Sequence, residues 1–226
     1  MDVFPEPDAA WTKHRIHPYI ASRPGEAGFV NFRQQPERIP EVLEDYLPHA
    51  DQPAVRTFFE FLRWINGPES VLETCDCALR GPEKAKSPKK AKSPWVLHGR
   101  VMLMHREPGA NCVEGAPTIF IKHLYEQLQL VDAPAPLQDV SAGLALCSVL
   151  YRDRCLSQPA ADESLSAGPY DPGLGQHVLL KFRAHGHSRP EVWEKLNIFY
   201  GLLWIACRRT SDHFQLLGGF LPPEPD

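Results

Sequence analysis

Hydrophobic residues recur at helical spacing in two neighbouring stretches of the first third of the chain. The first stretch has apolar side chains at i, i+3, i+4, i+7 and i+8, which is typical of one face of an amphipathic helix. The second follows Asp51 and Pro53, which suit a helix cap and a first turn, and it ends at the turn sequence Asn66–Pro68. These patterns predict two short helices packed antiparallel. Their apolar positions are Ile39, Val42, Leu43, Tyr46 and Leu47, then Val55, Phe58, Phe59, Leu62 and Ile65.

Alternation of period two then replaces the helical spacing. Residues 70–80 (SVLETCDCALR) and 95–107 (WVLHGRVMLMHRE) alternate in polarity, as strands with one buried face do. The segment between them contains the near-repeat KAKSP-KKAKSP, with five lysines from Lys84 to Lys92. We therefore expect a β-hairpin whose long loop, 81–94, is basic.

The second half of the chain adds further helices and strands. Residues 117–131 have helical spacing, and 177–185 (HVLLKFRAH) have the pattern of a strand. The helix predicted at about 189–209 begins with the S-x-x-E pattern of a capping box. Residues 139–151 are apolar on every face, so they form either a buried strand or a buried helix. This order predicts an α+β fold, with a small, largely antiparallel sheet packed with about four helices.

The length allows one large domain or two small ones. With 226 residues and 43% hydrophobic composition, the chain can bury a sizeable core. We expect a single α+β domain over 1–226, with an irregular lead-in over about 1–36 and a flexible loop at 157–176. The first residues lack the pattern of a secretory signal, and the longest apolar run, Ile198–Cys207, is half of the ~20 residues that a membrane span needs. These features predict a cytoplasmic protein with no membrane contact.

Net charge narrows the class of partner. The chain has 24 basic and 28 acidic residues, and without the five loop lysines 19 basic residues remain against 28, a formal charge of −9. Such a body repels nucleic-acid phosphates and attracts basic proteins. Five loop lysines neutralise at most about five phosphates and bind weakly at physiological salt, so the loop is interpreted as an exposed hairpin insertion. Nucleic-acid binding through 84–92 is a competing interpretation, but we expect no direct nucleic-acid contact.

Cysteine and histidine side chains near the two strands are candidates for chemistry. Cys75 and Cys77, at i and i+2 of a strand, are expected to point to one face, with His98 or His105 on the neighbouring strand. Zinc needs further ligands and the C-x₂-C spacing is absent, so we expect no metal and no cofactor. Motifs for a nucleophile elbow, a phosphate loop or a dinucleotide site are also absent. An enzyme with a Cys/His site near these strands is the alternative function.

The second predicted helix carries more aromatic bulk than one buried stripe holds. Its sequence FFEFLRW, residues 58–64, contains four aromatic side chains. Either this helix lies between two layers, or part of its surface contacts a partner.

Two short segments, Leu72–Pro82 (LETCDCALRGP) and His98–Met104 (HGRVMLM), resemble immunity proteins from toxin–immunity loci of bacterial, type VI-type secretion systems. The resemblance covers about eighteen of the 226 residues and implies a non-enzymatic protein that binds and blocks a cognate toxin. A toxin acting in the cytoplasm, such as a nuclease with a basic cleft, fits an acidic inhibitor. We therefore expect a non-catalytic immunity protein with a basic toxin as its partner. Acidic residues in or near predicted loops, Asp76, Glu107 and Glu114, are the expected partner-binding positions.

Overall fold

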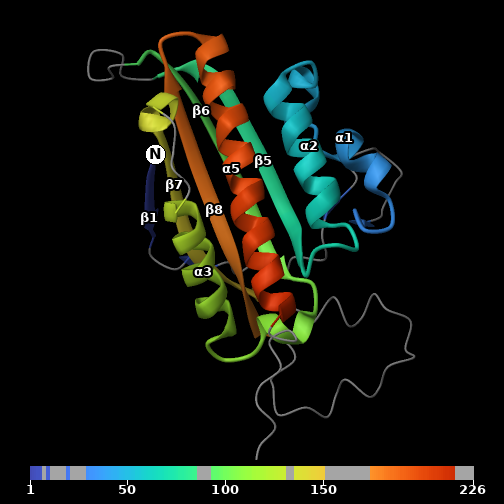
Figure 1. Cartoon of the computed structure of the whole chain (residues 1–226). Helices are drawn as coiled ribbons and strands as arrows, with labels where there is room; N and C mark the ends of the chain where they lie inside the picture. The colour runs from blue at the N-terminus through green and yellow to red at the C-terminus, as the bar shows by residue number, and fades with distance from the viewer. Residues whose placement is uncertain are drawn as a thin grey trace, which may run out of the picture.

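One β-sheet with helices over one of its faces forms the body of the protein (Figure 1). The computed structural model describes residues 1–6, 9–10, 19–20, 29–85, 93–130, 135–150 and 174–216. The strand order is β1-β7-β8-β6-β5, with β2 also beside β7, and β3 and β4 form a separate antiparallel pair. Only β1 and β2 run parallel to a neighbour among the described strands of this sheet. The strands are β1 Asp2–Pro5, β2 Ala9–Ala10, β3 Tyr19–Ile20, β4 Phe29–Val30, β5 Leu72–Lys84, β6 Trp95–His105, β7 Val140–Leu150 and β8 Leu174–Gly186.

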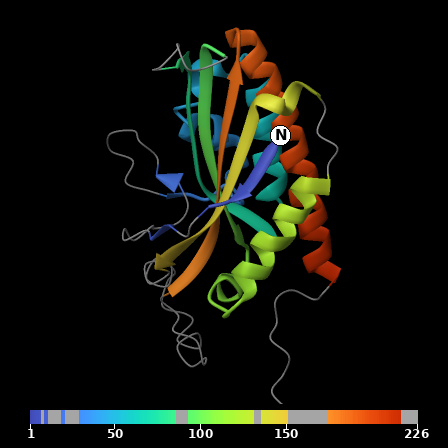
Figure 2. The same cartoon turned by 90° about the vertical axis from the view of Figure 1, so that its left-hand side faces the viewer.

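Three longer helices cover one face of the sheet, as Figure 2 shows from the side. The longest, α5, lies across the middle and contacts both α2 and α3. Shorter helical turns connect the elements. The α-helices are α1 Ile39–Val42, α2 Pro53–Ile65, α3 Ala116–Leu130 and α5 Arg189–Leu216, and the 3₁₀ turns are η1 Pro36–Arg38, η2 Leu47–His49, η3 Pro108–Asn111 and η4 Ala135–Asp139.

The α+β class and the largely antiparallel sheet predicted from the sequence are confirmed. Residues 139–151, for which strand and helix were both open, contain strand β7. Leu144 and Leu146 of this strand belong to the main core and Cys147 to a smaller apolar cluster on the other face, which explains why the segment is apolar on both faces.

Several predicted boundaries differ from the structure. Residues 2–5, inside the expected irregular lead-in, form an edge strand beside β7. β5 continues to Lys84, so the basic hairpin loop is shorter than 81–94, and residues 86–92 lie outside the described part of the chain. Most of the expected loop at 157–176 also lies outside it, but its last residues already belong to β8. The ends of these strands depend on pairing with neighbouring strands, which the local sequence pattern does not encode.

The first predicted helix is interrupted after α1. The chain then makes a turn and a 3₁₀ segment, η2, before α2 begins with Gln52 at its N-cap position rather than Asp51. The apolar stripe is buried as expected at Ile39, Leu43 and Tyr46. Pro48 has no backbone N–H with which to continue an α-helix through this point, and the long-range contacts of Tyr46 hold the turn in place.

Side chains alternate between the two faces of the sheet. On the helix-facing side, apolar residues of β6, β7 and β8 pack under α5 in the main core. Tyr200 of α5 stacks on Phe58 of α2, with ring centroids 4.5 Å apart, and meets Phe182 of β8 edge-on at 5.5 Å. Burial raises the pKa of the Tyr200 hydroxyl, so it stays neutral. These aromatic contacts join the helical layer to the sheet.

A buried lysine with two partly exposed carboxylate partners fixes the beginning of α5. Lys195 Nζ lies 2.9 Å from Asp139 Oδ2 and 2.7 Å from Glu191 Oε1, and it donates to the carbonyl oxygen of His185 at 2.9 Å. Burial lowers the pKa of Lys195, but the hydrogen bonds with Glu191 and Asp139 outweigh it and hold the pKa above its ordinary value. The Lys195 ammonium therefore stays charged, and it ties α5 to β8 and η4.

A substitution at Gly99 of β6 would test how tightly this core is packed. It lies opposite Phe182 in the strand pairing, and a Cβ added at Gly99 would collide with the Phe182 ring. That ring cannot move freely because Phe199 and Tyr200 pack against it. We expect Gly99→Ala to lower the free energy of unfolding by about 1–3 kcal/mol, measured by urea denaturation. Gly109→Ala is the control, since its Cβ meets nothing within 4 Å, and an equal loss there would contradict the packing argument.

Candidate functional site

The segment 36–51 carries a concentration of acidic side chains on the outer side of α2. It contains η1, α1 and η2 and holds five acidic residues against one arginine, a formal charge of −4 with histidine neutral. This surplus equals the net charge of the whole chain. We call residues 36–51 the acidic segment. Its acidic members are Glu37, Glu41, Glu44, Asp45 and Asp51.

Buried side chains anchor the acidic segment to the body. Ile39 and Tyr46 are fully buried, and the Tyr46 ring stacks on Phe58 of α2 with centroids 4.9 Å apart. The Tyr46 hydroxyl also lies 3.4 Å from the hydroxyl of Tyr200 and 3.4 Å from the carbonyl oxygen of Ala78. Because long-range contacts hold its inner side, the segment presents its outer side with little freedom.

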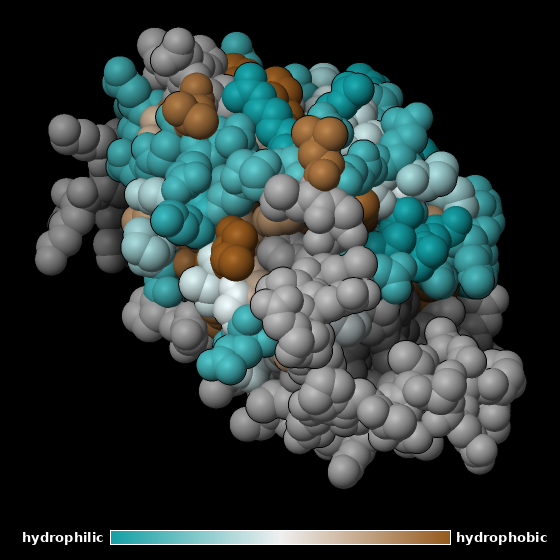
Figure 3. All heavy atoms as spheres, turned by 60° about the horizontal axis from the view of Figure 1, so that its bottom comes forward, coloured by the Kyte–Doolittle hydropathy of each residue, from teal (hydrophilic) through white to brown (hydrophobic). Residues whose placement is uncertain are grey.

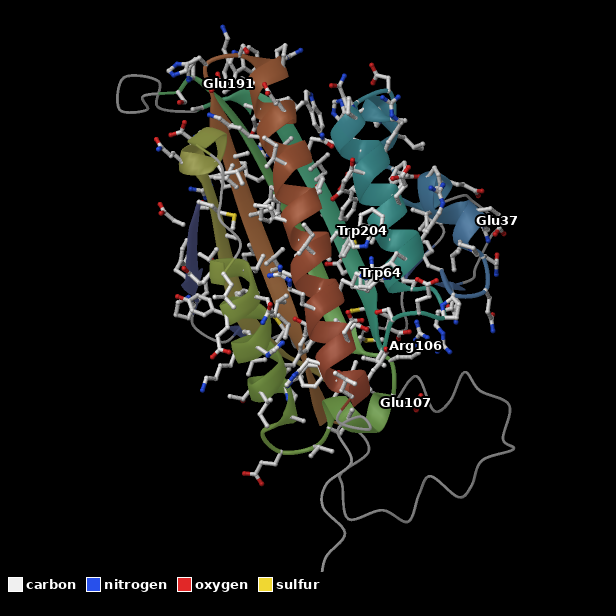
Figure 4. All side chains as sticks on the ribbon, viewed as in Figure 1. Glu37, Trp64, Arg106, Glu107, Glu191 and Trp204 are labelled. Atoms are coloured by element: carbon white, nitrogen blue, oxygen red, sulfur yellow. The ribbon has the colours of Figure 1, made fainter. Side chains whose placement is uncertain are left out.

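The outer side of the acidic segment presents carboxylates together with the exposed apolar side chain of Leu47. Glu37 projects away from the sheet (Figure 4), and Asp51 is exposed next to the start of α2. Leu47, between them in sequence, has 45% of its surface exposed. An exposed leucine among carboxylates suits a partner with a basic surface and an apolar contact.

The three acidic residues predicted as partner-binding positions lie in two places. Glu107 and Glu114 are exposed on the connection between β6 and α3, with Glu107 at the lower end of the molecule in Figure 4. Asp76 pairs across the sheet with Met102, on the face without helices, and its carboxylate accepts a hydrogen bond from Arg100 Nε at 2.7 Å. The structure thus brings Glu107 and Glu114 to one connection and places Asp76 apart from them, paired with a cation. Whether a partner binds any of the three stays a prediction.

Hydrophobic side chains reach the surface separately at the lower end. Figure 3 shows this end, where brown groups lie apart from one another among teal side chains in the described part of the chain. Ile119 of α3 and Leu216 at the end of α5 are exposed, at 55% and 87% of their surface.

The helix-free face of the sheet carries a group of basic side chains. Arg80 is paired with Glu83 at 3.2 Å, and Lys181 with Glu6 at 2.5 Å, so both charges are compensated locally. Arg183 instead donates from Nε to Nδ1 of His98, 3.2 Å away. Burial and the Arg183 charge hold the pKa of His98 below its ordinary value. The same two causes lower the pKa of His185, which lies on β8 with Arg183.

A buried cysteine–histidine contact lies further along the same face. Cys75 Sγ is 3.2 Å from Nδ1 of His177, and both residues are buried. His177 also pairs with Cys147 across β7 and β8. An apolar cluster surrounds the contact; its members are Cys75, Met102, Met104, Cys147 and Leu179. This geometry is compatible with two interpretations: a cysteine that only packs in the core, or a thiol paired with an imidazole for chemistry.

The cysteine and histidine residues proposed for an enzyme site do not come together. Cys75 and Cys77 were expected on one face, but the pairing shifts between Thr74 and Asp76, so Cys75 joins the cluster on the helix-free face while Cys77 packs against the main core. This prediction is wrong because a β-bulge breaks the alternation. His98 contacts Arg183, and His105 is hydrogen-bonded to the backbone of Glu107. His177 was not considered, because only the cross-strand register brings it to Cys75.

Within the described ranges, no three histidine, cysteine or acidic side chains are placed to hold a metal ion together. The helices that the structure describes include none that is both long and apolar enough to cross a membrane.

The Arg183–His98 contact predicts a measurable pKa change. The Nδ1 atom of His98 accepts from Arg183 only while the imidazole is neutral, so protonation breaks this contact and folding loses stability as pH falls below 6.5. We expect Arg183→Gln to raise the pKa of His98 toward 6.5, measured by NMR titration of the imidazole. Lys181→Gln is the control, because Lys181 pairs with Glu6 instead. An unchanged pKa in Arg183→Gln contradicts the assignment.

Comparison with known proteins reveals no relative of this chain. Neither a protein-family model, nor a curated protein, nor a solved structure matches the chain. Function therefore has to be inferred from the chain's own surfaces and buried groups.

Proposed function

We propose that this chain is a non-catalytic, partner-binding protein of the immunity type, which inhibits a basic protein toxin acting in the cytoplasm, such as a nuclease. The observation that carries the proposal is the acidic segment. Its charge of −4 is concentrated on sixteen residues, and buried anchors such as Tyr46 hold it against α2 and β5. The short resemblance of Leu72–Pro82 and His98–Met104 to immunity proteins points in the same direction.

Physical chemistry gives the acidic segment two roles in such a complex. Carboxylates facing a basic cleft speed the encounter of the two proteins and disfavour partners of the wrong charge. Exposed Leu47 supplies an apolar contact inside the charged rim. Because the segment is anchored before binding, less conformational entropy is lost when the complex forms. A stable complex buries about 1,600 Å² in total, so neighbouring surfaces must contribute as well.

The test uses the protein encoded by the neighbouring gene as the probe. Expressed alone, that product is expected to stop growth, and co-expression of this chain is expected to restore growth. The two purified proteins are expected to form a 1:1 complex in size-exclusion chromatography with light scattering. A neighbouring product that neither harms cells nor binds this chain contradicts the proposal.

Reversing charges on the acidic segment tests whether this segment is the surface that binds the toxin. We expect Glu37→Lys/Asp51→Lys to slow association at least about tenfold in stopped-flow or surface-plasmon measurements, because it turns attraction into repulsion. Glu69→Lys/Glu126→Lys changes the net charge equally at exposed positions outside the acidic segment, and it is expected to leave the rate nearly unchanged. If Glu107→Lys/Glu114→Lys is the variant that loses binding, the interface lies at the β6–α3 connection instead.

A cysteine enzyme is the second candidate, and the Cys75–His177 contact favours it. A catalytic thiolate is accessible and reacts faster than an unperturbed thiol. Cys75 is 6% exposed among thioethers and leucine, so we expect iodoacetamide to label it more slowly in the folded protein than in urea, followed by peptide mass spectrometry. Faster labelling in the folded protein, abolished by His177→Phe, would instead support the enzyme.

A further inference from the structure

The outward side of α5 forms a continuous ridge on the helical layer. Its residues follow one another at i, i+4, i+7, i+11 and i+14, opposite the stripe that packs on the sheet. We call this line the α5 ridge. It consists of Glu194, Ile198, Gly201, Ile205 and Arg208, none of which is buried.

Gly201 lies at the centre of the α5 ridge, and no described residue packs against the position where its Cβ would be. Glycine destabilises a helix interior relative to alanine, and Gly201 is in the middle of a 28-residue helix. Its φ is not positive, and a Cβ added there would meet nothing within 4 Å. Among the described residues, neither the backbone nor the packing therefore needs a glycine at this position. A glycine would allow close approach by the backbone of a second molecule.

The surface around Gly201 is apolar. Ile205 is 44% exposed, and Ile198 and Leu202 are half-buried. Trp204 lies beside Trp64 of α2, with ring centroids 6.2 Å apart, at the boundary between the two helices (Figure 4). A glycine between larger apolar side chains lets the side chains of a second helix pack close to the α5 backbone.

The charges at the two ends of the α5 ridge identify the occupant. Glu194 and Arg208 are each seven residues from Gly201, which is about 10 Å along the helix. Both are exposed, and neither forms a hydrogen bond or ion pair with the described part of the chain. A two-fold axis through Gly201 that packs two copies of α5 antiparallel places Glu194 of each copy opposite Arg208 of the other. We propose that the α5 ridge is the homodimer interface of this protein.

The ridge meets the requirement of an interface between identical surfaces. In such an interface, residue i contacts residue j and residue j contacts residue i, so the surface must be complementary to itself. With the axis at Gly201, Ile198 faces Trp204 of the second copy and Asn197 faces Ile205. Glycine at the crossing point lets the two helix axes come closer than the usual 8–10 Å. A basic toxin would leave Arg208 unpaired, whereas a second copy pairs both charges.

This dimer is independent of the proposed function. The acidic segment lies outside α2, and the α5 ridge lies on α5 itself, so one surface can be used without covering the other. The dimer is tested without a toxin, and its failure would leave the toxin proposal standing.

Sedimentation velocity at rising protein concentration tests the dimer and its register. We expect the wild-type protein to dimerise with a Kd on the order of 10 μM. Glu194→Arg and Arg208→Glu each place like charges opposite one another, so each raises the Kd at least about tenfold. Mixing the two variants restores dimers, because each mixed pair then has two matched ion pairs. Lys84→Glu, at the end of β5, changes the net charge as Arg208→Glu does and leaves the Kd unchanged.

Gly201→Ala separates the fold from the interface. In the dilute monomer the added methyl group raises the melting temperature, because alanine favours the helix and nothing opposes it. At high concentration the same methyl group weakens the dimer by holding the two helices apart. A wild-type protein that stays monomeric well above this Kd overturns the proposal, and so do single charge reversals that leave the dimer intact.

Discussion

Four buried aromatic rings connect the acidic segment, through α2 and α5, to the sheet. Tyr46 stacks on Phe58, Phe58 stacks on Tyr200, and Tyr200 meets Phe182 edge-on. Each such ring buries about 150–250 Å² of mainly apolar surface, so the group contributes strongly to the stability of the core. The two tyrosine hydroxyls lie 3.4 Å apart, which leaves neither polar group isolated. Both proposed binding surfaces depend on this contact, because it fixes the acidic segment on α2 and the direction in which α5 presents its outer ridge.

Placing all longer helices on one face divides the molecule into two chemically different sides. The helical side buries the main core and presents the acidic segment and the α5 ridge outward. The opposite face of the sheet has no described helix and carries paired charges such as Arg100 with Asp76, together with a small sulfur-rich cluster around Cys75. Burial, together with the nearby Arg183 charge, lowers the pKa of His98 and His185 there. The face of the sheet opposite the helical layer that carries the acidic segment thus holds the basic residues Arg80, Arg100, Lys181 and Arg183.

Hydrophobic periodicity was sufficient to predict the elements that pack along one stripe. The predicted stripe of α5 is buried at Trp193, Tyr200 and Cys207, and α3 lies within one residue of its predicted range. Periodicity failed where a distant contact changes the backbone. The first predicted helix stops after α1, where Tyr46 instead reaches Tyr200, 154 residues away. The β-bulge in β5 separates Cys75 from Cys77, and cross-strand register brings His177 to Cys75. The expected partner-binding residues were selected by charge and by nearness to predicted loops, and the structure shows that Asp76 is already paired with Arg100.

The sequence by itself determined the α+β class, the long buried helix and the acidic character of the chain, because these depend on local spacing and on composition. Tertiary structure decided which charges are compensated, which thiol meets an imidazole and which side of α5 stays outside, because each depends on residues far apart in the chain. The meaning of Gly201 shows this difference. In the sequence it is one glycine in an apolar run, and only its position at the centre of the exposed ridge, between Glu194 and Arg208, makes it the centre of a self-complementary surface.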